Sequence, residues 1–141
     1  MLPHFNKDCY LDHVAIAVSD IDVAQKRWEA LGLTFSPERE VVESQLVTTA
    51  FAPIDEHAHV ELLCPYGEGG AIKKFIEKNG EGIHHLCFKV PDVKAKMEEL
   101  KTHGFRFIYE EATVGANNCL VNFIHPKSTG GVLIEISQTL K

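Results

Sequence analysis

The sequence lacks any run of about 18 consecutive apolar residues, the length that a helix needs to span a lipid bilayer. Its first ten residues, MLPHFNKDCY, are polar and mixed in character. A secretory signal peptide would instead show a basic stretch followed by an apolar one. These two absences predict a cytoplasmic protein with no membrane partner.

Basic residues are fewer than acidic ones. The chain has 14 Lys and Arg against 20 Asp and Glu, which gives a formal net charge of −6 with neutral histidines. Proteins that bind nucleic acid normally show a basic balance or a basic stripe. The charge therefore argues against a nucleic-acid partner.

The four cysteines include no C-x-x-C pair; they are Cys9, Cys64, Cys87 and Cys119. Zinc ribbons and thioredoxin-like proteins depend on such closely spaced pairs, so the sequence excludes both classes. We expect the thiols to be reduced, as they are in most cytoplasmic proteins.

The composition is that of an ordinary globular protein, with 45% hydrophobic and 24% charged residues. A chain of 141 residues can bury a sizeable core. We therefore expect residues 1–141 to form a single domain.

An internal repeat divides this domain into two similar halves. Residues 11–35 (LDHVAIAVSDIDVAQKRWEALGLTF) align without a gap with residues 83–107 (IHHLCFKVPDVKAKMEELKTHGFRF), at an offset of 72 residues. Most aligned positions keep their apolar or polar character. The identical pairs are His13/His85, Val18/Val90, Asp20/Asp92, Gly32/Gly104 and Phe35/Phe107. Such self-similarity predicts two homologous modules.

Each half shows the same order of local signals. Segments 11–18 and 83–90 alternate in the manner of strands, and a helix with a capping residue and a terminal glycine follows each of them. Three more strands complete each half. We expect them near residues 33–36, 46–53 and 59–64, and near residues 105–109, 118–125 and 131–137. Residues 69–78 are predicted to form a linker helix.

The order β-α-β-β-β therefore occurs twice and predicts an α+β fold. Module 1 covers about residues 9–65, and module 2 covers about residues 83–138. We expect these two tandem βαβββ modules to form a curled mixed sheet around a cleft, with the helices outside. The functional site would then lie in the cleft.

Two histidines and two glutamates recur at matching places in the halves. Because neighbouring side chains on a strand point to opposite faces, the match to His13 selects His85 rather than His84 for the cleft. Each half also ends in an apolar strand with one carboxylate, Glu61 in HVELLCP and Glu135 in GVLIEIS. A lone charge among apolar residues is costly unless it is paired or bound to a metal.

The sequence therefore predicts a four-ligand site for a divalent metal, formed by His13, Glu61, His85 and Glu135. Mixed nitrogen and oxygen ligation suits Zn, Co, Ni, Mn or Fe. Taken singly, each residue has a simpler explanation, as a histidine at a strand rim or a glutamate facing solvent. The recurrence of the pair favours the metal site. His59 shares the face of Glu61 by its spacing of two residues.

Four segments resemble the vicinal oxygen chelate superfamily, whose fold is glyoxalase-like. They are LDHVAIAV (11–18), VELLCP (60–65), GIHHLCFKV (82–90) and FIHPKSTGGVLIEI (123–136). The similarity extends from Leu11 to Gln138. GIHH and FIHPK…GGVLIE are most similar to the methylmalonyl-CoA epimerase branch.

The resemblance implies paired βαβββ modules, usually as a homodimer, with one divalent metal per site (Co, Zn, Ni or Mn). The family's metal ligands would fall on His13, Glu61, His85 and Glu135. Some epimerases have glutamine where this chain has Glu61. The implied partner is an acyl-CoA, and the implied reaction interconverts the (R) and (S) forms of methylmalonyl-CoA by proton transfer at the α-carbon.

The resemblance gives Glu135 a second role as an acid/base. Some family members place another glutamate on the strand predicted at 46–53, where this chain has Thr49. Glu43, just before that strand, is the substitute candidate for this catalytic role, and the alternative is a surface-loop residue.

Two alternative functions remain at this level. One is a glyoxalase I-like lactoylglutathione lyase, which uses the same ligand types. The other is a non-catalytic, small-molecule-binding member of the superfamily, against which the intact ligand set argues. An iron dioxygenase is disfavoured because it would use two histidines and one carboxylate and leave coordination positions open.

Overall fold

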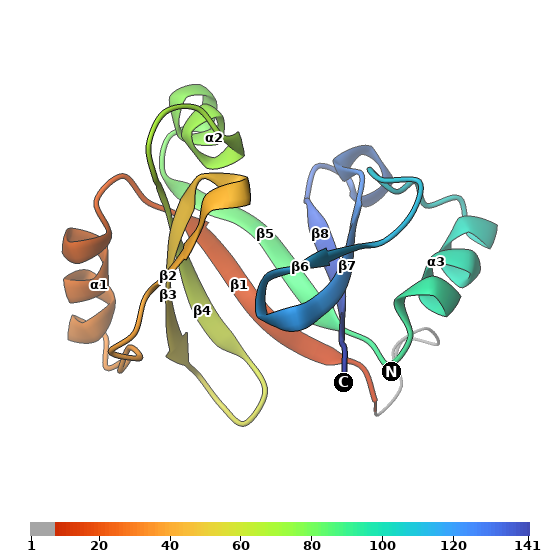
Figure 1. Cartoon of the computed structure of the whole chain (residues 1–141), viewed down its shortest axis with the longest axis horizontal. Helices are drawn as coiled ribbons and strands as arrows, with labels where there is room; N and C mark the ends of the chain where they lie inside the picture. Colours follow the sequence, from red (N-terminus) through yellow and green to blue (C-terminus); the bar gives the residue numbers. More distant parts are fainter. Residues whose placement is uncertain (1–7) are drawn as a thin grey trace. The chain divides into compact units, whose positions relative to one another are not determined.

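Residues 8–141 are described by a computed structural model, drawn in Figure 1. Its contacts separate them into two units. Unit 1 contains residues 8–12 and 85–141, and unit 2 contains residues 13–84. None of the helices in this described part has the length and apolar character that crossing a bilayer would require.

Unit 2 is built on a mixed four-stranded sheet in the order β2-β3-β4-β1. Its strands are β1 (Tyr10–Ala17), β2 (Glu40–Val42), β3 (Val47–Pro53) and β4 (His59–Pro65). The unit boundaries cut two strands: residues 10–12 of β1 fall in unit 1, and residues 82–84 of β5 fall in unit 2. Strand β3 pairs antiparallel with both β2 and β4, whereas β4 and β1 are parallel. A parallel pair needs a crossover connection, and helix α1 (Ile21–Ala30) lies in it.

The two faces of this sheet carry different cores. Ile16 and Leu62 point to the α1 side, where they pack with Trp28 and Phe35. The strand residues next to Ile16 and Leu62 in the chain point to the other face. There, helix α2 (Ala71–Asn79) covers an apolar cluster of Ala15, Ala17, Val47, Leu63 and Ile72.

Unit 1 repeats this arrangement in the order β5-β8-β7-β6. Its strands are β5 (Gly82–Lys89), β6 (Thr113–Gly115), β7 (Cys119–Ile124) and β8 (Ile134–Thr139). Strands β5 and β8 are parallel, and the other pairs are antiparallel. Helix α3 (Val93–Thr102) buries Met97 and Leu100 against Ile136 of the sheet.

The predicted repeat is confirmed in the first strand and helix of each unit. Strands β1 and β5 have the same length and begin 72 residues apart, as do helices α1 and α3. Both helices begin after an aspartate whose carboxylate accepts backbone N–H groups of the first turn. Asp20 accepts from Asp22 and Val23, and Asp92 accepts from Ala95.

Two of the predicted strands are wrong. Residues 33–36 and 105–109 form no strand, and the short strands β2 and β6 occur later in the chain. Phe35 and Phe107 do anchor these segments in the cores, but only isolated backbone bonds join them to the sheets. Irregular segments that bury every second side chain resemble strands in sequence.

The predicted linker helix is confirmed as α2, but it begins at Ala71 rather than at residue 69. Gly70 has a φ of +89°, and a Cβ there would lie 3.1 Å from Cβ of Leu46. Leu46 itself adopts the left-handed conformation, with a φ of 53°, after the short helix η1 (Glu43–Gln45). The β2–β3 connection is therefore packed against the start of α2.

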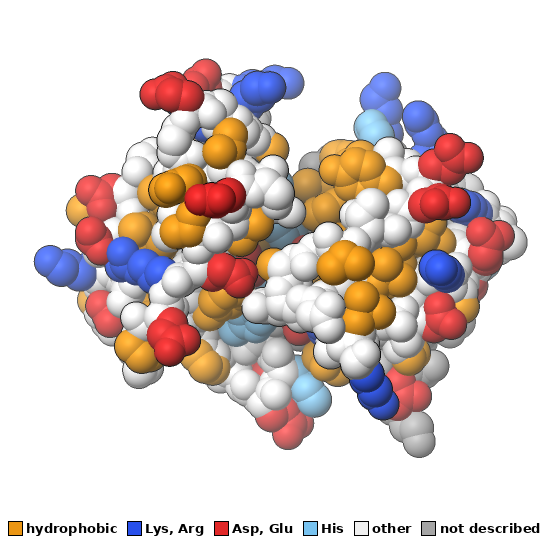
Figure 2. Space-filling model, in the orientation of Figure 1, with side chains coloured by type: hydrophobic (Ala, Val, Ile, Leu, Met, Phe, Trp, Pro, Cys, Tyr) orange, Lys and Arg blue, Asp and Glu red, His pale blue; other side chains and the backbone are white. Residues whose placement is uncertain are grey.

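Charged side chains of both signs are interspersed on the face shown in Figure 2. On α3, Lys96 lies 3.0 Å from Glu99 and Lys101 lies 3.4 Å from Glu98. The Lys101–Glu98 pair is exposed, and such pairs contribute only about 0.2–0.5 kcal/mol. The Lys96 side chain is only 9% exposed, and Glu99 pairs its charge.

The cap of α3 yields a prediction about stability. Asp92→Ala removes the acceptor for the Ala95 N–H, and we expect the free energy of unfolding to fall by about 1 kcal/mol. Asp92→Asn keeps an oxygen acceptor, so its free energy of unfolding should fall by only a small fraction of that amount. Urea denaturation of both variants measures the difference, and equal losses in the two would contradict the capping role.

Candidate metal centre

In unit 2, His13 and Glu61 are diagonal neighbours on the parallel strands β1 and β4. Glu61 lies opposite Ala15 in the strand register, two residues from His13, so both side chains project from the same face. The Nε2 atom of His13 lies 3.5 Å from Oε2 of Glu61. The side chains are only 11% and 13% exposed. The sheet therefore buries an imidazole and a carboxylate side by side.

Unit 1 builds the same pair on β5 and β8. Glu135 lies opposite Cys87, two residues from His85. The Nε2 atom of His85 lies 3.1 Å from Oε1 of Glu135, and the side chains are 9% and 14% exposed. We call the sheet face that carries the His–Glu pair the site face of each unit.

The register shows that Glu61 and Glu135 are equivalent, although they are 74 residues apart rather than 72. Their opposite residues, Ala15 and Cys87, are separated by the repeat length of 72. The connection from β7 to β8 is longer than the connection from β3 to β4, and it moves the last strand along the chain. The register thus confirms that the one carboxylate in the last apolar strand of each half occupies the same position in the two units.

An aromatic side chain accompanies each pair. Phe51 lies opposite Glu61 on β3, and Phe123 lies opposite Glu135 on β7. The Phe51 ring meets His59 edge-on with a centroid distance of 5.0 Å, and the Phe123 ring meets His85 at 5.8 Å. Apolar rings beside a carboxylate reduce its access to water and strengthen its interaction with a neighbouring charge.

The donor atoms of each pair fit a shared divalent ion. Two ligands bonded to one ion at about 2.0–2.2 Å lie roughly 3.0–3.5 Å apart, which matches both measured separations. The alternative is a charge-assisted contact between an imidazolium and a carboxylate, but such hydrogen bonds are normally shorter, about 2.7–2.9 Å. Either arrangement removes the cost of burying an unpaired charge.

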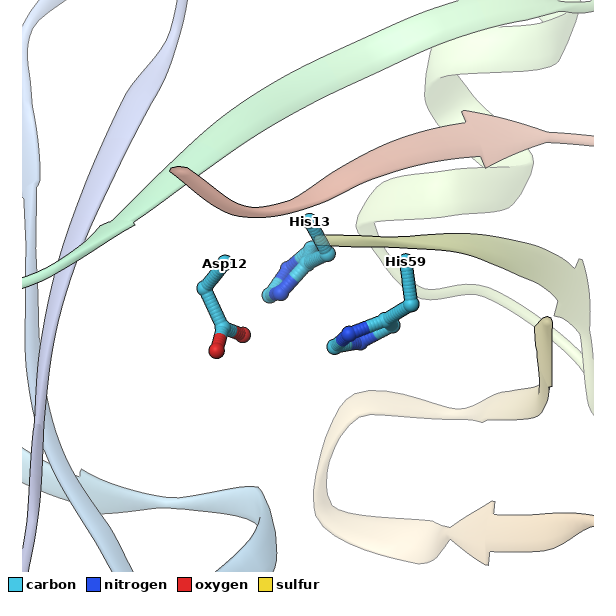
Figure 3. Close-up of side chains that lie close together, drawn as sticks. All are labelled: Asp12, His13 and His59. Carbon is cyan, nitrogen blue, oxygen red and sulfur yellow. The ribbon is translucent and has the colours of Figure 1, made fainter. Parts of the chain in front are cut away.

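His59 lies on the site face of unit 2, as its spacing from Glu61 predicts. It is opposite His13 in the register, and the two rings are 5.1 Å apart. Figure 3 shows both rings beside Asp12, which precedes His13 on β1. Each of the three residues offers one ligand atom, and these atoms lie within 4.8 Å of one another. Sequence analysis did not identify Asp12, because strand alternation alone would direct its side chain away from that of His13.

The choice between the two adjacent histidines follows the sequence argument. His84 meets the ring of Phe75 on α2 edge-on, with a centroid distance of 4.9 Å. His85 instead lies beside Glu135 and is 7% exposed as a residue. The two side chains therefore have separate environments.

Sequence reasoning missed Lys89, the single Lys or Arg in the eight strands of the described chain. Its spacing of four residues from His85 puts it on the site face of unit 1. The Nζ atom lies 3.1 Å from Oγ1 of Thr139 and 3.5 Å from both Sγ of Cys119 and Oγ of Ser137.

The charge of Lys89 is stabilised by its surroundings. Burial by itself acts to lower its pKa, but the charge of Asp12 and the neighbouring thiols of Cys119 and Cys87 outweigh burial. The net result is a pKa above the ordinary lysine value. Lys89 is therefore a cation at neutral pH.

Thr49, which stands where some family members have a glutamate, and Glu43, the substitute candidate for the second acid/base, lie in different places. Thr49 is buried in β3, and its hydroxyl lies 3.4 Å from the backbone oxygen of Glu40. Glu43 is exposed and begins helix η1, outside the strands. Glu43 therefore lies at the edge of the sheet, just after the end of β2.

Comparisons with known proteins agree with one another. The sequence profile of the Glyoxalase/Bleomycin resistance protein/Dioxygenase superfamily matches residues 12–123. The chain is 38% identical to the ethylmalonyl-CoA/methylmalonyl-CoA epimerase of Cereibacter sphaeroides, over 91% of this chain and 96% of that protein. It is 37% identical to the human mitochondrial methylmalonyl-CoA epimerase, over 91% of this chain and 73% of the other.

Solved structures give the same result. The crystal structure of methylmalonyl-CoA epimerase from Mycobacterium tuberculosis superposes with a TM-score of 0.83 at 38% identity, covering 93% of this chain and 88% of the other. A variant of the Streptomyces coelicolor methylmalonyl-CoA epimerase in complex with 2-nitronate-propionyl-CoA superposes with a TM-score of 0.84 at 33% identity, covering 92% and 94%.

The environment of Lys89 predicts a change of stability in alkali. A pKa that is higher in the folded than in the unfolded state stabilises the fold below the unfolded pKa, and this stabilisation is lost as the pH rises through the folded pKa. Between about pH 9 and 12, wild type should therefore lose more unfolding free energy than Lys89→Met. Parallel curves for the two proteins in urea denaturation would contradict this account.

Proposed function

Because this chain belongs to the glyoxalase/bleomycin resistance protein/dioxygenase superfamily and, within it, to the methylmalonyl-CoA epimerase family, we propose that it interconverts the (R) and (S) forms of methylmalonyl-CoA. The observation that carries the proposal is the buried His–Glu pair, which occurs at the same register position in each unit. Two solved complexes of similar epimerases support this class of substrate: the Streptomyces coelicolor variant with 2-nitronate-propionyl-CoA, and a methylmalonyl-CoA epimerase with methylmalonyl-CoA.

The reaction requires removal of the hydrogen between a carboxylate and a thioester, and its return to the opposite face of the α-carbon. Such a hydrogen is weakly acidic, so the negative charge that develops on the oxygens must be stabilised. A base and an acid must also lie within reach of the carbon. The site needs a cation or other electrophile and at least one carboxylate.

We propose that His13, Glu61, His85 and Glu135 together hold one divalent metal ion, of which Co, Zn, Ni and Mn are candidates. The nitrogen and oxygen donors are of the right type, and the separation of the donor atoms within each pair supports the assignment. A bound divalent ion supplies Lewis-acid stabilisation to the substrate oxygens.

Glu135 is the proposed acid/base on one side of the substrate. Its carboxylate is close to the imidazole of His85 and to the ring of Phe123 in a poorly hydrated place. For the second proton-transferring group the sequence offers Glu43, which stays a prediction. Formation of a homodimer and a cytoplasmic location stay predictions as well.

The test of the function is hydrogen exchange at C2 of methylmalonyl-CoA in heavy water. We expect exchange together with interconversion of the two epimers, and no turnover of methylglyoxal with glutathione. A glyoxalase I-like lyase would give the opposite result in the two assays. Absence of both activities in metal-loaded protein would favour a binding protein.

Removal of a proposed ligand should lower metal content and epimerase activity together. Glu61→Ala and His85→Ala each delete one donor from the set. We expect the fold to survive, because neither residue belongs to the core on the helix side of its sheet. Elemental analysis of the purified variants gives the metal stoichiometry. His57→Ala, at an exposed histidine in the β3–β4 connection, is the matched control. Full activity of a ligand variant at unchanged metal content would refute its assignment.

Replacement of Glu135 by glutamine separates its two proposed roles. Glu135→Gln keeps the size of the side chain and one oxygen donor but removes the basic oxygen. General-base catalysis is worth about 10²–10⁴-fold, so we expect kcat to fall within this range at full metal occupancy. Restoration of wild-type exchange for both epimers by excess metal would show that Glu135 is only a ligand.

A further inference from the structure

The strands of the described chain contain four acidic side chains: Asp12, Glu40, Glu61 and Glu135. Glu61 and Glu135 are each next to a histidine, and Asp12 contributes to the charge environment of Lys89. Glu40 remains outside these interactions. We propose that Glu40 is the second proton-transferring residue of the epimerase site, an inference that rests on the proposed function above.

The strand register puts Glu40 on the site face of unit 2. Glu40 lies opposite Thr49, and Thr49 lies opposite Leu63. Directly opposed residues on antiparallel strands project from the same face, and so do Leu63 and Glu61, which are two residues apart on β4. Glu40, Thr49 and Glu61 therefore share one face.

Packing supports the same orientation independently. Val42, two residues after Glu40, packs against the cluster of Val47, Leu63 and Ile72 under helix α2. That cluster lies on the site face, because it also contains Ala15, the residue opposite Glu61. The side chain of Glu40 must project from the same face as that of Val42.

The strand register separates Glu40 from the His13–Glu61 pair. Strand β2 is separated from β4 by β3 alone, and Glu40 is level with Leu63, two residues from Glu61. The backbones of Glu40 and Glu61 are therefore about 12 Å apart on the sheet. On this face of β3, Thr49 lies beside Glu40 with its hydroxyl directed to the backbone of Glu40, and Phe51 lies beside Glu61. Glu40 is thus too far from the His13–Glu61 pair to act as a ligand, but an acyl group can lie between them.

The carboxylate of Glu40 is also available for proton transfer. The residue is half-buried, and among residues 8–141 its carboxylate has no hydrogen-bond or ion-pair partner. A half-buried carboxylate without a partner is suited to accept a proton from a bound substrate. Glu43 differs from Glu40 in burial and in position. It is exposed, and it precedes the turn at Leu46 rather than lying in a strand.

The proposed step is balanced as follows. With one epimer, the α-carbon–hydrogen bond breaks, its electron pair is delocalised onto the substrate oxygens, and the proton forms an O–H bond with the Glu40 carboxylate. A protonated Glu135 then gives its proton to the opposite face of the carbon. The other epimer uses the two residues in reverse order, and exchange with water restores their protonation states.

The decisive experiment compares Glu40→Gln with wild type in heavy water, using each epimer of methylmalonyl-CoA separately. We expect exchange from one epimer to fall by about 10²–10⁴-fold, while exchange from the other epimer, which depends on Glu135, is retained. Metal content and the thermal unfolding midpoint should match those of wild type. Glu38→Gln, an exposed neighbour in the irregular segment before β2, is the control and should exchange both epimers normally.

A rescue variant tests the geometry itself. Thr49 is directly opposite Glu40 on the same face, so Thr49→Glu in the Glu40→Gln background returns a carboxylate to the site from the adjacent strand. We expect this double variant to regain exchange from the affected epimer. If Glu40 had only a structural role, the added carboxylate at position 49 would not restore exchange from that one epimer.

Other results would overturn the inference. Wild-type exchange of both epimers by Glu40→Gln would exclude Glu40 from proton transfer, and an epimer-specific loss in Glu43→Gln alone would assign the role to Glu43. An equal loss for both epimers in proportion to lost metal would reduce Glu40 to a structural residue. If wild type itself neither exchanges nor epimerises the substrate, the proposed function fails, and the role of Glu40 fails with it.

Discussion

The candidate site depends on the cost of placing a carboxylate on the mostly apolar face of a sheet. A buried carboxylate must have a partner, and here the neighbouring parallel strand supplies one, a histidine two residues from the opposed position. The same solution occurs in both units, with donor atoms 3.5 and 3.1 Å apart. Each unit thus presents a paired nitrogen and oxygen donor on one face, and the helix on the opposite face supplies the core that holds the strands in register.

Equivalent positions in the two units nevertheless carry different chemistry. Ala17 and Leu63 of unit 2 lie in the apolar cluster that α2 covers. Their counterparts in unit 1 are Lys89 and Ser137, which lie in a polar cluster with raised lysine pKa. The repeat therefore preserves the His–Glu pair and the helix-side core, while the rest of the site face has diverged.

Local signals were sufficient where the structure depends on neighbours in the chain. Helix α3 begins after Asp92, as expected, because a cap involves only residues within one turn. In the first half, Ser19 with Asp22 resembles a capping box in sequence, but the cap of α1 is the next residue, Asp20. The strand predictions at 33–36 and 105–109 failed because alternate burial of Phe35 or Phe107 needs no partner strand. Whether such a segment pairs depends on distant backbone groups, which local periodicity does not report.

The amino-acid sequence by itself determined the twofold repeat, the helix starts and the histidine and glutamate types available in each half, because these follow from local composition and spacing. Only the tertiary structure decided which residues face one another. The longer β7–β8 connection shifts Glu135 by two positions relative to the repeat, and the register of β2 on β3 brings Glu40 to the site face. Register is set by hydrogen bonds between strands far apart in the chain, and a shift of one residue would turn every side chain to the other face.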